Sequence, residues 1–84
     1  MPVAISNTPN PNALKFTVGA DVGGPLTFAA GSQPDDPMAA ELIAIEGVTS
    51  MFATADFITL SKRPDFPWEP IAAEAQTILE RYFE

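Results

Sequence analysis

Apolar and polar residues alternate along several short runs, which is the pattern of strands that bury one face. The clearest run is Leu14, Lys15, Phe16, Thr17 and Val18, in which every second side chain is apolar. Similar β-type runs, bounded by turn-forming residues, predict four further strands. We expect the five strands over residues 3–6, 13–18, 26–30, 48–53 and 57–62.

Two later segments repeat their apolar residues with the 3.6-residue period of a helix. In the first, Met38, Leu42 and Ile45 recur at i, i+4 and i+7, which predicts a short amphipathic helix. The second begins at Trp68 and carries a continuous apolar stripe, which predicts a longer helix with one buried face. The stripe consists of Ile71, Ala72, Ala75, Ile78, Leu79 and Tyr82.

The ends of the shorter helix are marked by residues that suit helix termini. Asp35 or Asp36 offers a carboxylate for the N-cap, and Pro37 fits the first helical position. Gly47 follows the last turn and can adopt the left-handed conformation that ends many helices. These signals predict a helix that begins after the two aspartates and ends before the glycine.

The predicted order is three strands, a helix, two strands and a second helix. Neighbouring strands joined by short loops favour antiparallel pairing. A sheet with one apolar face needs a cover, and the two helical stripes can provide it. The sequence therefore predicts an α+β two-layer sandwich, with a mainly antiparallel sheet and two helices packed on one face. We expect the 84 residues to form a single domain over residues 1–84.

The net charge of the chain limits the kinds of partner that it can bind. Eleven acidic residues face four basic ones, so the formal net charge is −7. The chain lacks the basic stripe that phosphate backbones require, and we expect neither nucleic acid nor a membrane as partner. A basic protein patch or a cation is electrostatically more plausible.

The sequence shows neither a membrane span nor a signal peptide. No run approaches the roughly 20 apolar residues of a membrane span, and the first residues lack a signal-peptide pattern. The expected compartment is therefore the cytoplasm.

The chain contains no cysteine and no histidine, so thiolate and imidazole chemistry are excluded. Paired carboxylates could still perform acid–base work, and Asp35, Asp36 and Glu41 are the candidates. They lie near a predicted helix N-terminus, where acids stabilise the helix dipole, so we expect a capping role. We assign no catalytic residue, cofactor or metal ligand, and we expect the chain not to be an enzyme.

The most distinctive segment is Thr8-Pro9-Asn10-Pro11-Asn12, called the 8–12 loop below. Its two prolines fix φ and remove two backbone donors, so the segment cannot be a central strand or a helix. One interpretation is a rigid connection whose Asn side chains bond nearby backbone groups. The other is a preorganised polar surface for a partner, since rigid loops lose little entropy on docking. The residues alone leave both interpretations open.

Several aromatic residues are candidates for either core or surface. Trp68 heads the helical stripe and is expected in the core, whereas Phe66, next to two prolines, could be buried or exposed. Phe52 and Phe57 flank the expected hairpin connection at residues 54–56, and one of them should be partly exposed. Asp56 is interpreted as a residue of this turn.

The same residues resemble a known family over nearly the whole chain. The motif TPNPNALKF at residues 8–16 resembles the TPNPN-x-LKF signature that opens the N-terminal domain of Nfu/NifU-type iron–sulfur scaffold proteins. Residues 37–48 are similar to the family's S-PLA…LF-x-I-x-GV stretch, and residues 52–60 resemble its VFFGxDFITV. Trp68 matches the tryptophan that opens its last helix. One departure is Ala53-Thr54-Ala55, since a glycine is common before the Asp and the hairpin turn could differ.

The resemblance implies the fold and an association with iron–sulfur cluster assembly. In the two-domain members the cluster is held by a C-x-x-C motif in a separate C-terminal domain, and these 84 residues lack that motif. We therefore expect a non-catalytic interaction or accessory domain that binds an iron–sulfur assembly or recipient protein. The alternative is weak iron binding through carboxylates. The candidate partner-binding residues are Thr8, Asn10, Asn12, Lys15, Asp56 and Phe57.

Overall fold

Strands and helices follow one another in the order that the sequence predicts. The structure is a computed structural model that describes residues 3–19, 21 and 25–83. Neither helix in these ranges has the length and apolar character needed to cross a membrane. The elements are β1 (Ala4–Asn7), β2 (Ala13–Thr17), β3 (Leu26–Ala29), α1 (Pro37–Ile43), β4 (Val48–Thr54), β5 (Phe57–Lys62) and α2 (Trp68–Phe83).

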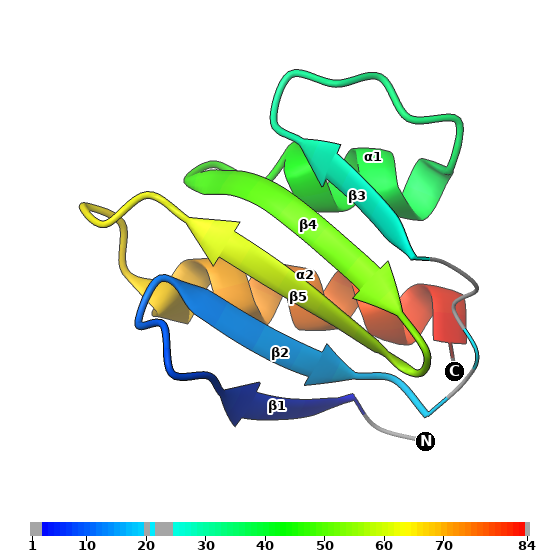
Figure 1. Cartoon of the computed structure of the whole chain (residues 1–84), viewed down its shortest axis with the longest axis horizontal. Coiled ribbons are helices and arrows are strands. Elements are labelled where there is room, and N and C mark those ends of the chain that lie inside the picture. Colours follow the sequence, from blue (N-terminus) through cyan, green and yellow to red (C-terminus); the bar gives the residue numbers. More distant parts are fainter. Residues whose placement is uncertain (1–2, 20, 22–24, 84) are drawn as a thin grey trace.

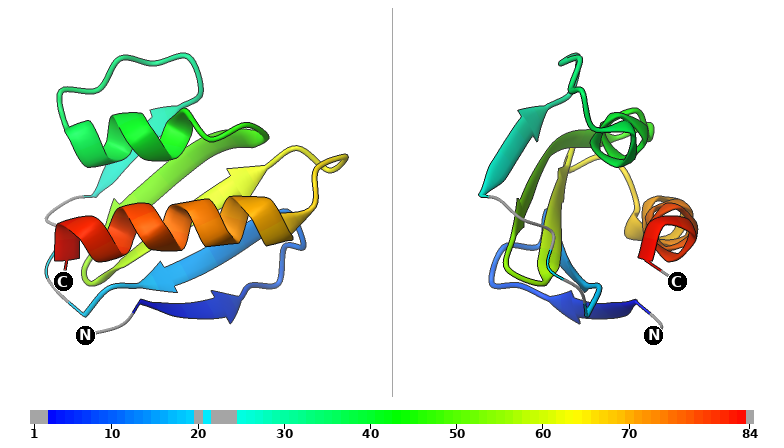
Figure 2. Two further views of the ribbon diagram at one scale, coloured as in Figure 1. Left: turned by 180° about the vertical axis from the view of Figure 1, so that it is seen from behind. Right: turned by 90° about the vertical axis from the view of Figure 1, so that its right-hand side faces the viewer.

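The strands form one sheet in which every neighbouring pair is antiparallel. Its order is β1-β2-β5-β4-β3, so the β4–β5 hairpin lies between β2 and β3 (Figure 1). The chain reaches β4 from β3 through α1, and α2 follows β5. Figure 2 shows both helices on the same face of the twisted sheet, with the other face uncovered. This arrangement confirms the predicted α+β two-layer sandwich.

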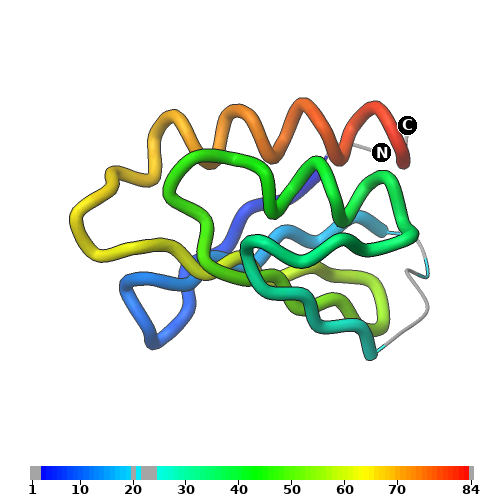
Figure 3. Tube along the Cα trace, turned by 90° about the horizontal axis from the view of Figure 1, so that it is seen from above, coloured from blue at the N-terminus to red at the C-terminus, as the bar shows by residue number. Residues whose placement is uncertain are grey.

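The core lies between the sheet and the helices because alternate strand residues point toward the same face. Leu14 faces Leu60 and Phe16 faces Ile58 across β2 and β5, and all four side chains are buried. Figure 3 shows the two layers from above. The helices bury Met38, Ala39, Leu42 and Ile43 from α1 and Ile71, Ala75, Ile78 and Leu79 from α2.

Gly47 has the left-handed backbone conformation that the sequence predicts, with φ of 97°. The same residue is also a point of close approach. A Cβ placed on it would lie 2.8 Å from two ring carbons of Phe66, so the missing side chain lets that ring pack closely. Phe66, whose burial the sequence left open, is half-buried against the core.

Three apolar residues differ from their predicted positions. Tyr82 belongs to the predicted stripe but is 41% exposed, because its hydroxyl reaches Glu41 of α1. Trp68 is half-buried instead of lying in the core, because its indole N–H turns toward the 8–12 loop. Ile45 is buried as expected, but it lies beyond the end of α1 at Ile43.

The N-terminus of α1 is capped by one of the two aspartates. Asp36 Oδ1 accepts the Met38 backbone N–H at 2.9 Å, and Pro37 occupies the first helical position. The capping role expected for Asp36 is therefore confirmed. Glu41 does not cap the helix, because it lies within α1 and its carboxylate faces α2.

Candidate functional site

Hydrogen bonds within the 8–12 loop fix its shape. The Thr8 hydroxyl lies 2.8 Å from the Asn10 carbonyl oxygen and 2.9 Å from that of Ala13, so its single proton can be donated to either. The hydroxyl oxygen accepts the Asn10 backbone N–H at 3.2 Å. Asn10 Oδ1 in turn accepts the Asn12 backbone N–H at 2.9 Å. The Thr8 and Asn10 side chains thus serve as hydrogen-bond partners for backbone groups within the loop.

Further bonds attach the loop to the C-terminal half of the chain. The Lys62 backbone N–H donates to the Asn12 carbonyl at 2.8 Å, and Lys62 Nζ donates to Asn12 Oδ1 at 3.3 Å. Lys62 Nζ also donates to the Arg63 carbonyl at 3.2 Å. Trp68 Nε1–H donates to the Pro11 carbonyl at 2.9 Å. The loop is therefore held against the end of β5 and the start of α2.

The hairpin tip consists of Ala55 and Asp56, since Thr54 already pairs with Phe57. Thr54, which the sequence placed in the connection, instead ends β4. Ala55 has φ of 52°, a conformation that favours glycine. The Asp56 carbonyl accepts the Val18 N–H at 2.8 Å, which ties the turn to the end of β2. Asp56 is thus a turn residue, as expected, and the family's missing glycine leaves alanine in a strained position.

Lys15 and Phe57 lie together on the sheet face that the helices do not cover. Lys15 Nζ is 4.4 Å from the centroid of the Phe57 ring, within the range of a cation–π interaction. Phe57 is half-buried and Phe52 is 39% exposed, which confirms that one of the pair is partly exposed. Thr59 faces Lys15 on one side and Phe52 on the other, so these side chains form a row across the uncovered face.

This uncovered face carries no acidic strand residue. None of the five strands contains Asp or Glu, and the acids occupy helices and connections. Apart from Lys15, Phe52 and Phe57, the strand positions that share the face are Ser, Thr and Ala. The strand residues of this face thus present one cation and two aromatic rings among small, weakly polar side chains.

The six candidate residues occupy two places instead of one. β2 and β5 run antiparallel, so the 8–12 loop meets Lys62 at one end of the pair, whereas Asp56 and Phe57 lie near Thr17 at the other (Figure 1). At about 3.3 Å per residue, the length of the strands separates the two ends by roughly 15 Å. Lys15 contacts the hairpin group through the Phe57 ring. A partner that touches both groups must therefore extend along the strands.

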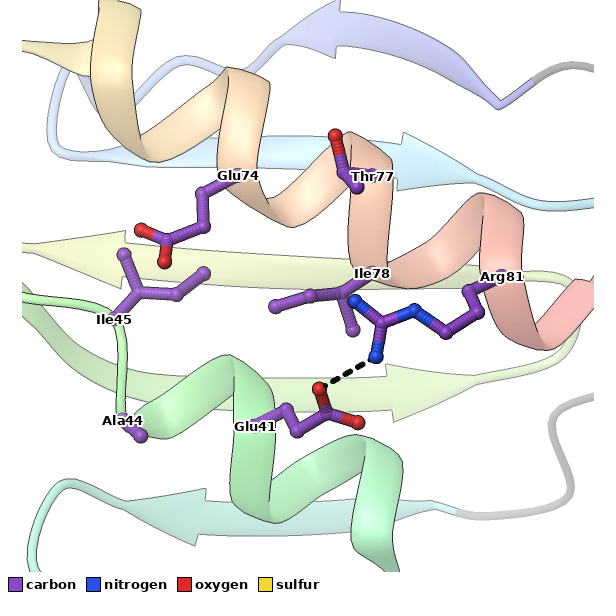
Figure 4. Close-up of a pocket in the computed structure, with 7 residues that line it drawn as sticks. All are labelled: Glu41, Ala44, Ile45, Glu74, Thr77, Ile78 and Arg81. Carbon is purple, nitrogen blue, oxygen red and sulfur yellow. Dashed lines mark hydrogen bonds and ion pairs between the residues drawn. The ribbon is translucent and has the colours of Figure 1, made fainter.

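On the helical side, a groove runs between α1 and α2. Two hollows with volumes of about 410 and 210 Å³ lie next to each other and share Ile45 and Glu74 in their walls. Figure 4 shows the larger hollow, with Ile45 and Ile78 between the helices and Arg81 reaching from α2 toward Glu41. We call this feature the α1–α2 groove.

Glu41 joins the two helices at one end of this groove. Arg81 Nη1 lies 2.8 Å from Glu41 Oε1, and the Tyr82 hydroxyl donates to Glu41 Oε2. The Tyr82 hydrogen bond, followed by that of Arg81, lowers the pKa of Glu41 below its ordinary value. The same bond raises the pKa of Tyr82, because ionised tyrosine would face a carboxylate. Glu41 therefore links α1 to α2 and is not the capping residue that the sequence predicted.

The remaining carboxylates do not assemble into a metal site within residues 3–19, 21 and 25–83. No group of three acidic side chains in these ranges is arranged to hold a metal ion. Hard cations are bound by several oxygen ligands converging on one point. No observation in this part of the chain therefore favours the alternative of iron binding through carboxylates.

Two functional features escaped the sequence-based predictions. Lys62 was predicted only as the end of a strand, yet it anchors the 8–12 loop and is 9% exposed. A signal was available, because the alternation of Ile58, Leu60 and Lys62 places the lysine on the buried face. The α1–α2 groove carries no comparable signal, since it depends on how two separate helices pack.

These features define a small α+β domain with a docked Pro–Asn loop, and comparison with known families identifies it. The family described as "Scaffold protein Nfu/NifU N terminal" matches residues 3–84. The chain belongs to this family. It is 36% identical to the NFU1 iron-sulfur cluster scaffold homolog, mitochondrial, of Drosophila erecta, and 37% identical to that of Drosophila sechellia. Each alignment covers 96% of this chain but only 30% of the relative.

Solved structures share the fold. Protein SAV1430 from Staphylococcus aureus superposes with a TM-score of 0.78 at 28% identity, over 93% of this chain and 98% of that one. SeR13 from Staphylococcus epidermidis gives a TM-score of 0.66 at 27% identity, over 98% and 99% of the two chains. The sequence resemblance to the family is thus confirmed.

The expected cytoplasmic location is wrong by the same comparison. The Drosophila relatives are named as mitochondrial proteins. The expectation rested on the lack of a membrane-span run and of a signal-peptide pattern in these residues, and such absences do not specify a compartment. A targeting segment, where one is used, is separate from the fold and is removed after import.

Proposed function

We propose that this chain is a non-catalytic accessory domain of iron–sulfur cluster assembly and that it acts by binding a protein. The observation that carries the proposal is the family match over residues 3–84, together with relatives that are named iron-sulfur cluster scaffolds. The 84 residues supply no thiolate, so the sulfur ligands of a cluster must come from elsewhere. We also propose that residues 1–84 act as a single domain.

The proposed contact residues are Lys15 and Phe57 on the uncovered face, with Asp56 beside them at the hairpin tip. Among the strand residues that the structure describes, Lys15 is the only charged one on this face, and the cation–π contact holds its ammonium group near the ring. A partner surface with a carboxylate opposite Lys15 and an apolar side chain beside Phe57 would complement it. An interface of this kind needs no catalytic group from the chain.

Within the same proposal, the 8–12 loop forms a second contact area. Thr8 and Asn10 use their side-chain oxygens to build the turn, whereas Asn12 is bonded to Lys62. The loop thus presents Pro9 and the Asn10 amide nitrogen in a fixed geometry. Preorganisation of this kind reduces the entropy lost when a partner binds.

Affinity purification from cells of the source organism tests the function. The tagged chain should enrich iron–sulfur assembly or recipient proteins above a tag-only control, as identified by mass spectrometry. Lys15→Glu should lose this enrichment, because it places a like charge opposite the partner's carboxylate. Glu80→Lys, on the helical side, reverses a charge away from the proposed contact and should retain it. If no iron–sulfur protein is enriched by the unaltered chain, the proposed function is wrong.

The loop is tested separately with Asn10→Ala and Asn12→Ala. Each variant should retain the fold by circular dichroism but lose part of the enrichment if the loop contacts the partner. Should both variants enrich the same proteins as the unaltered chain, the loop is only a structural connection. That result would leave the uncovered face as the contact surface.

A further inference from the structure

The α1–α2 groove combines an apolar floor with an acidic rim. Ile45 and Ile78 form the floor of the larger hollow, and Ile71 and Phe66 contribute to the smaller one. The larger hollow lies between α1 and α2 (Figure 4), on the side of the sheet that the helices cover. Lys15 alternates with buried Leu14 and Phe16 and therefore lies on the uncovered face. The hollows thus place nearly buried apolar side chains, with Ile45 5% and Ile78 6% exposed, directly beside exposed carboxylates.

The two ends of the groove differ in charge. At one end, Arg81 neutralises Glu41 through an ion pair of 2.8 Å. Along the rest of the rim, Glu46 and Glu74 are exposed, and neither has an ion-pair partner among residues 3–19, 21 and 25–83. The shared wall of the two hollows thus carries uncompensated negative charge directly beside apolar floor.

We propose that the α1–α2 groove binds a basic segment of a protein partner, which inserts a large apolar side chain between Ile45 and Ile78 and places lysine or arginine against Glu46 and Glu74. The inference rests on the proposed function, because it names the chemistry of a partner that an accessory domain would bind. It assigns that partner to a surface separate from Lys15 and Phe57.

Charge complementarity selects this occupant over the alternatives. An acidic peptide or a phosphate backbone would meet Glu46 and Glu74 together with the net charge of −7. A second copy of the chain carries the same net charge and is repelled for the same reason. A basic segment gains from both features, because its apolar side chain is removed from water and its cations pair with free carboxylates.

The test uses a synthetic, fluorescein-labelled helical probe of roughly 14 residues, long enough to form a marginal helix on its own. Leucines occupy one face and lysines the remainder. One matched probe replaces the lysines with glutamates, and another replaces the leucines with serines. Fluorescence anisotropy measures affinity for the folded chain, and amide chemical shifts from NMR locate the bound probe.

Two charge-reversal variants with the same change in net charge separate local from global attraction. Glu46→Lys combined with Glu74→Lys alters the rim, whereas Asp35→Lys combined with Glu80→Lys alters acids outside the groove. We expect the rim variant to weaken binding of the lysine–leucine probe by about tenfold or more, as for the loss and reversal of two ion pairs at a partly apolar site. The control variant should weaken binding by less than about threefold.

A steric variant tests the apolar floor without disturbing the core. Ala44 is exposed and lines the larger hollow, so Ala44→Trp fills that space from the surface. Binding should be lost while the thermal unfolding curve and the far-ultraviolet dichroism stay unchanged. The serine probe should bind at least about tenfold more weakly than the leucine probe, in keeping with two or more lost apolar contacts.

Several results would overturn the inference. Equal losses of affinity in the two charge-reversal variants would show that the interaction is only long-range electrostatic attraction. Equal affinity for the leucine and serine probes would show the same. Preference for the glutamate probe would reverse the assigned chemistry. Sedimentation that shows a dimer of the unaltered chain and a monomer of Ala44→Trp would assign the groove to a second copy. The affinity purification with Lys15→Glu tests the proposed function and alters none of the groove residues. The proposed function and the groove proposal can therefore fail independently of each other.

Discussion

The indole Nε1–H of Trp68 donates a 2.9 Å hydrogen bond to the carbonyl oxygen of Pro11, which lies 57 residues earlier in the chain. This bond explains why the tryptophan at the start of α2 is half-buried instead of lying in the core. The ring also lies 5.6 Å from Lys62 Nζ, so the tryptophan, the lysine and the loop form one contact region. The conformation of the 8–12 loop therefore depends on the first residue of the last helix.

Trp68→Phe tests this dependence by keeping an aromatic ring while removing the donor. We expect the free energy of unfolding to fall by about 1 kcal/mol, the usual net value of one hydrogen bond. Urea denaturation followed by circular dichroism provides the measurement, and the amide resonance of Asn12, which follows the Pro11 carbonyl, should shift by NMR. A stability equal to that of the unaltered chain would mean that the loop is held by the Lys62 contacts alone.

Ala55→Gly should stabilise the chain. The φ of 52° at Ala55 is strained for a residue with a Cβ, and glycine relieves that strain at the tip of the β4–β5 hairpin. We expect a gain of about 0.5–1 kcal/mol after the greater entropy of the unfolded glycine is subtracted. Ala73→Gly, at an exposed position of α2, is the matched control and should destabilise by about 1 kcal/mol. A loss of stability in Ala55→Gly would show that this turn does not need glycine.

Ile78→Ala should be strongly destabilising. Ile78 is 6% exposed and packs on the core side of α2, so truncation leaves a cavity. A loss of about 2–5 kcal/mol is expected, as for other large-to-small core changes. Thr77→Ala, on the exposed neighbour, should change stability by less than about 0.5 kcal/mol. If Ile78→Ala costs no more than Thr77→Ala, the helix does not bury the face assigned to it.

Tyr82→Phe should raise the pKa of Glu41 toward its ordinary value of 4.5, because the Tyr82 hydrogen bond is the main cause of the lowered pKa. NMR titration of the side-chain carboxyl carbon measures the shift. Arg81→Gln removes the Arg81 charge and its ion pair and should also raise the pKa of Glu41. An unchanged Glu41 pKa in Tyr82→Phe would show that the hydroxyl does not bond this carboxylate in solution.

The same contact sets a pH window for its contribution to stability. Folding lowers the pKa of Glu41, so the contribution is present above the unfolded value of 4.5 and is lost as pH falls through the folded pKa. Folding raises the pKa of Tyr82, so the contribution is present below 10.0 and is lost as pH rises through the folded pKa. The melting temperatures of Tyr82→Phe and of the unaltered chain should therefore differ between pH 4.5 and 10.0. They should become equal once the pH falls below the folded pKa of Glu41 or rises above that of Tyr82.

Much of the fold follows from the sequence because local signals agree. The alternating pattern predicted correctly that Leu14 and Phe16 share the buried face of β2. Gly47, which follows α1, has the left-handed conformation that its residue type predicts. The strand order did not follow, because consecutive β2 and β3 are not neighbours and the later β4–β5 hairpin separates them. Pairing of distant strands depends on the whole core and leaves no mark in any short segment.

The candidate site was less predictable than the fold for the same reason. The bonds within the 8–12 loop involve neighbours such as Thr8 and Asn10, and turn chemistry of this kind is visible in sequence. The bond from Lys62 to Asn12 spans 50 residues and appears only once β5 lies beside β2. The separation of Asp56 from the loop likewise follows from antiparallel pairing. Sequence reasoning could name these residues, but it could not say which of them share a surface.

The attachment of the 8–12 loop to β5 and α2 also has a consequence for the time course of folding. Closing contacts over 50 and 57 residues requires nearly the whole chain to be synthesised and collapsed first. The loop's final geometry therefore requires β5 and the start of α2 to be in place, however local its internal turn is. Any protein that recognises this geometry distinguishes the completed molecule from a nascent or partly unfolded chain.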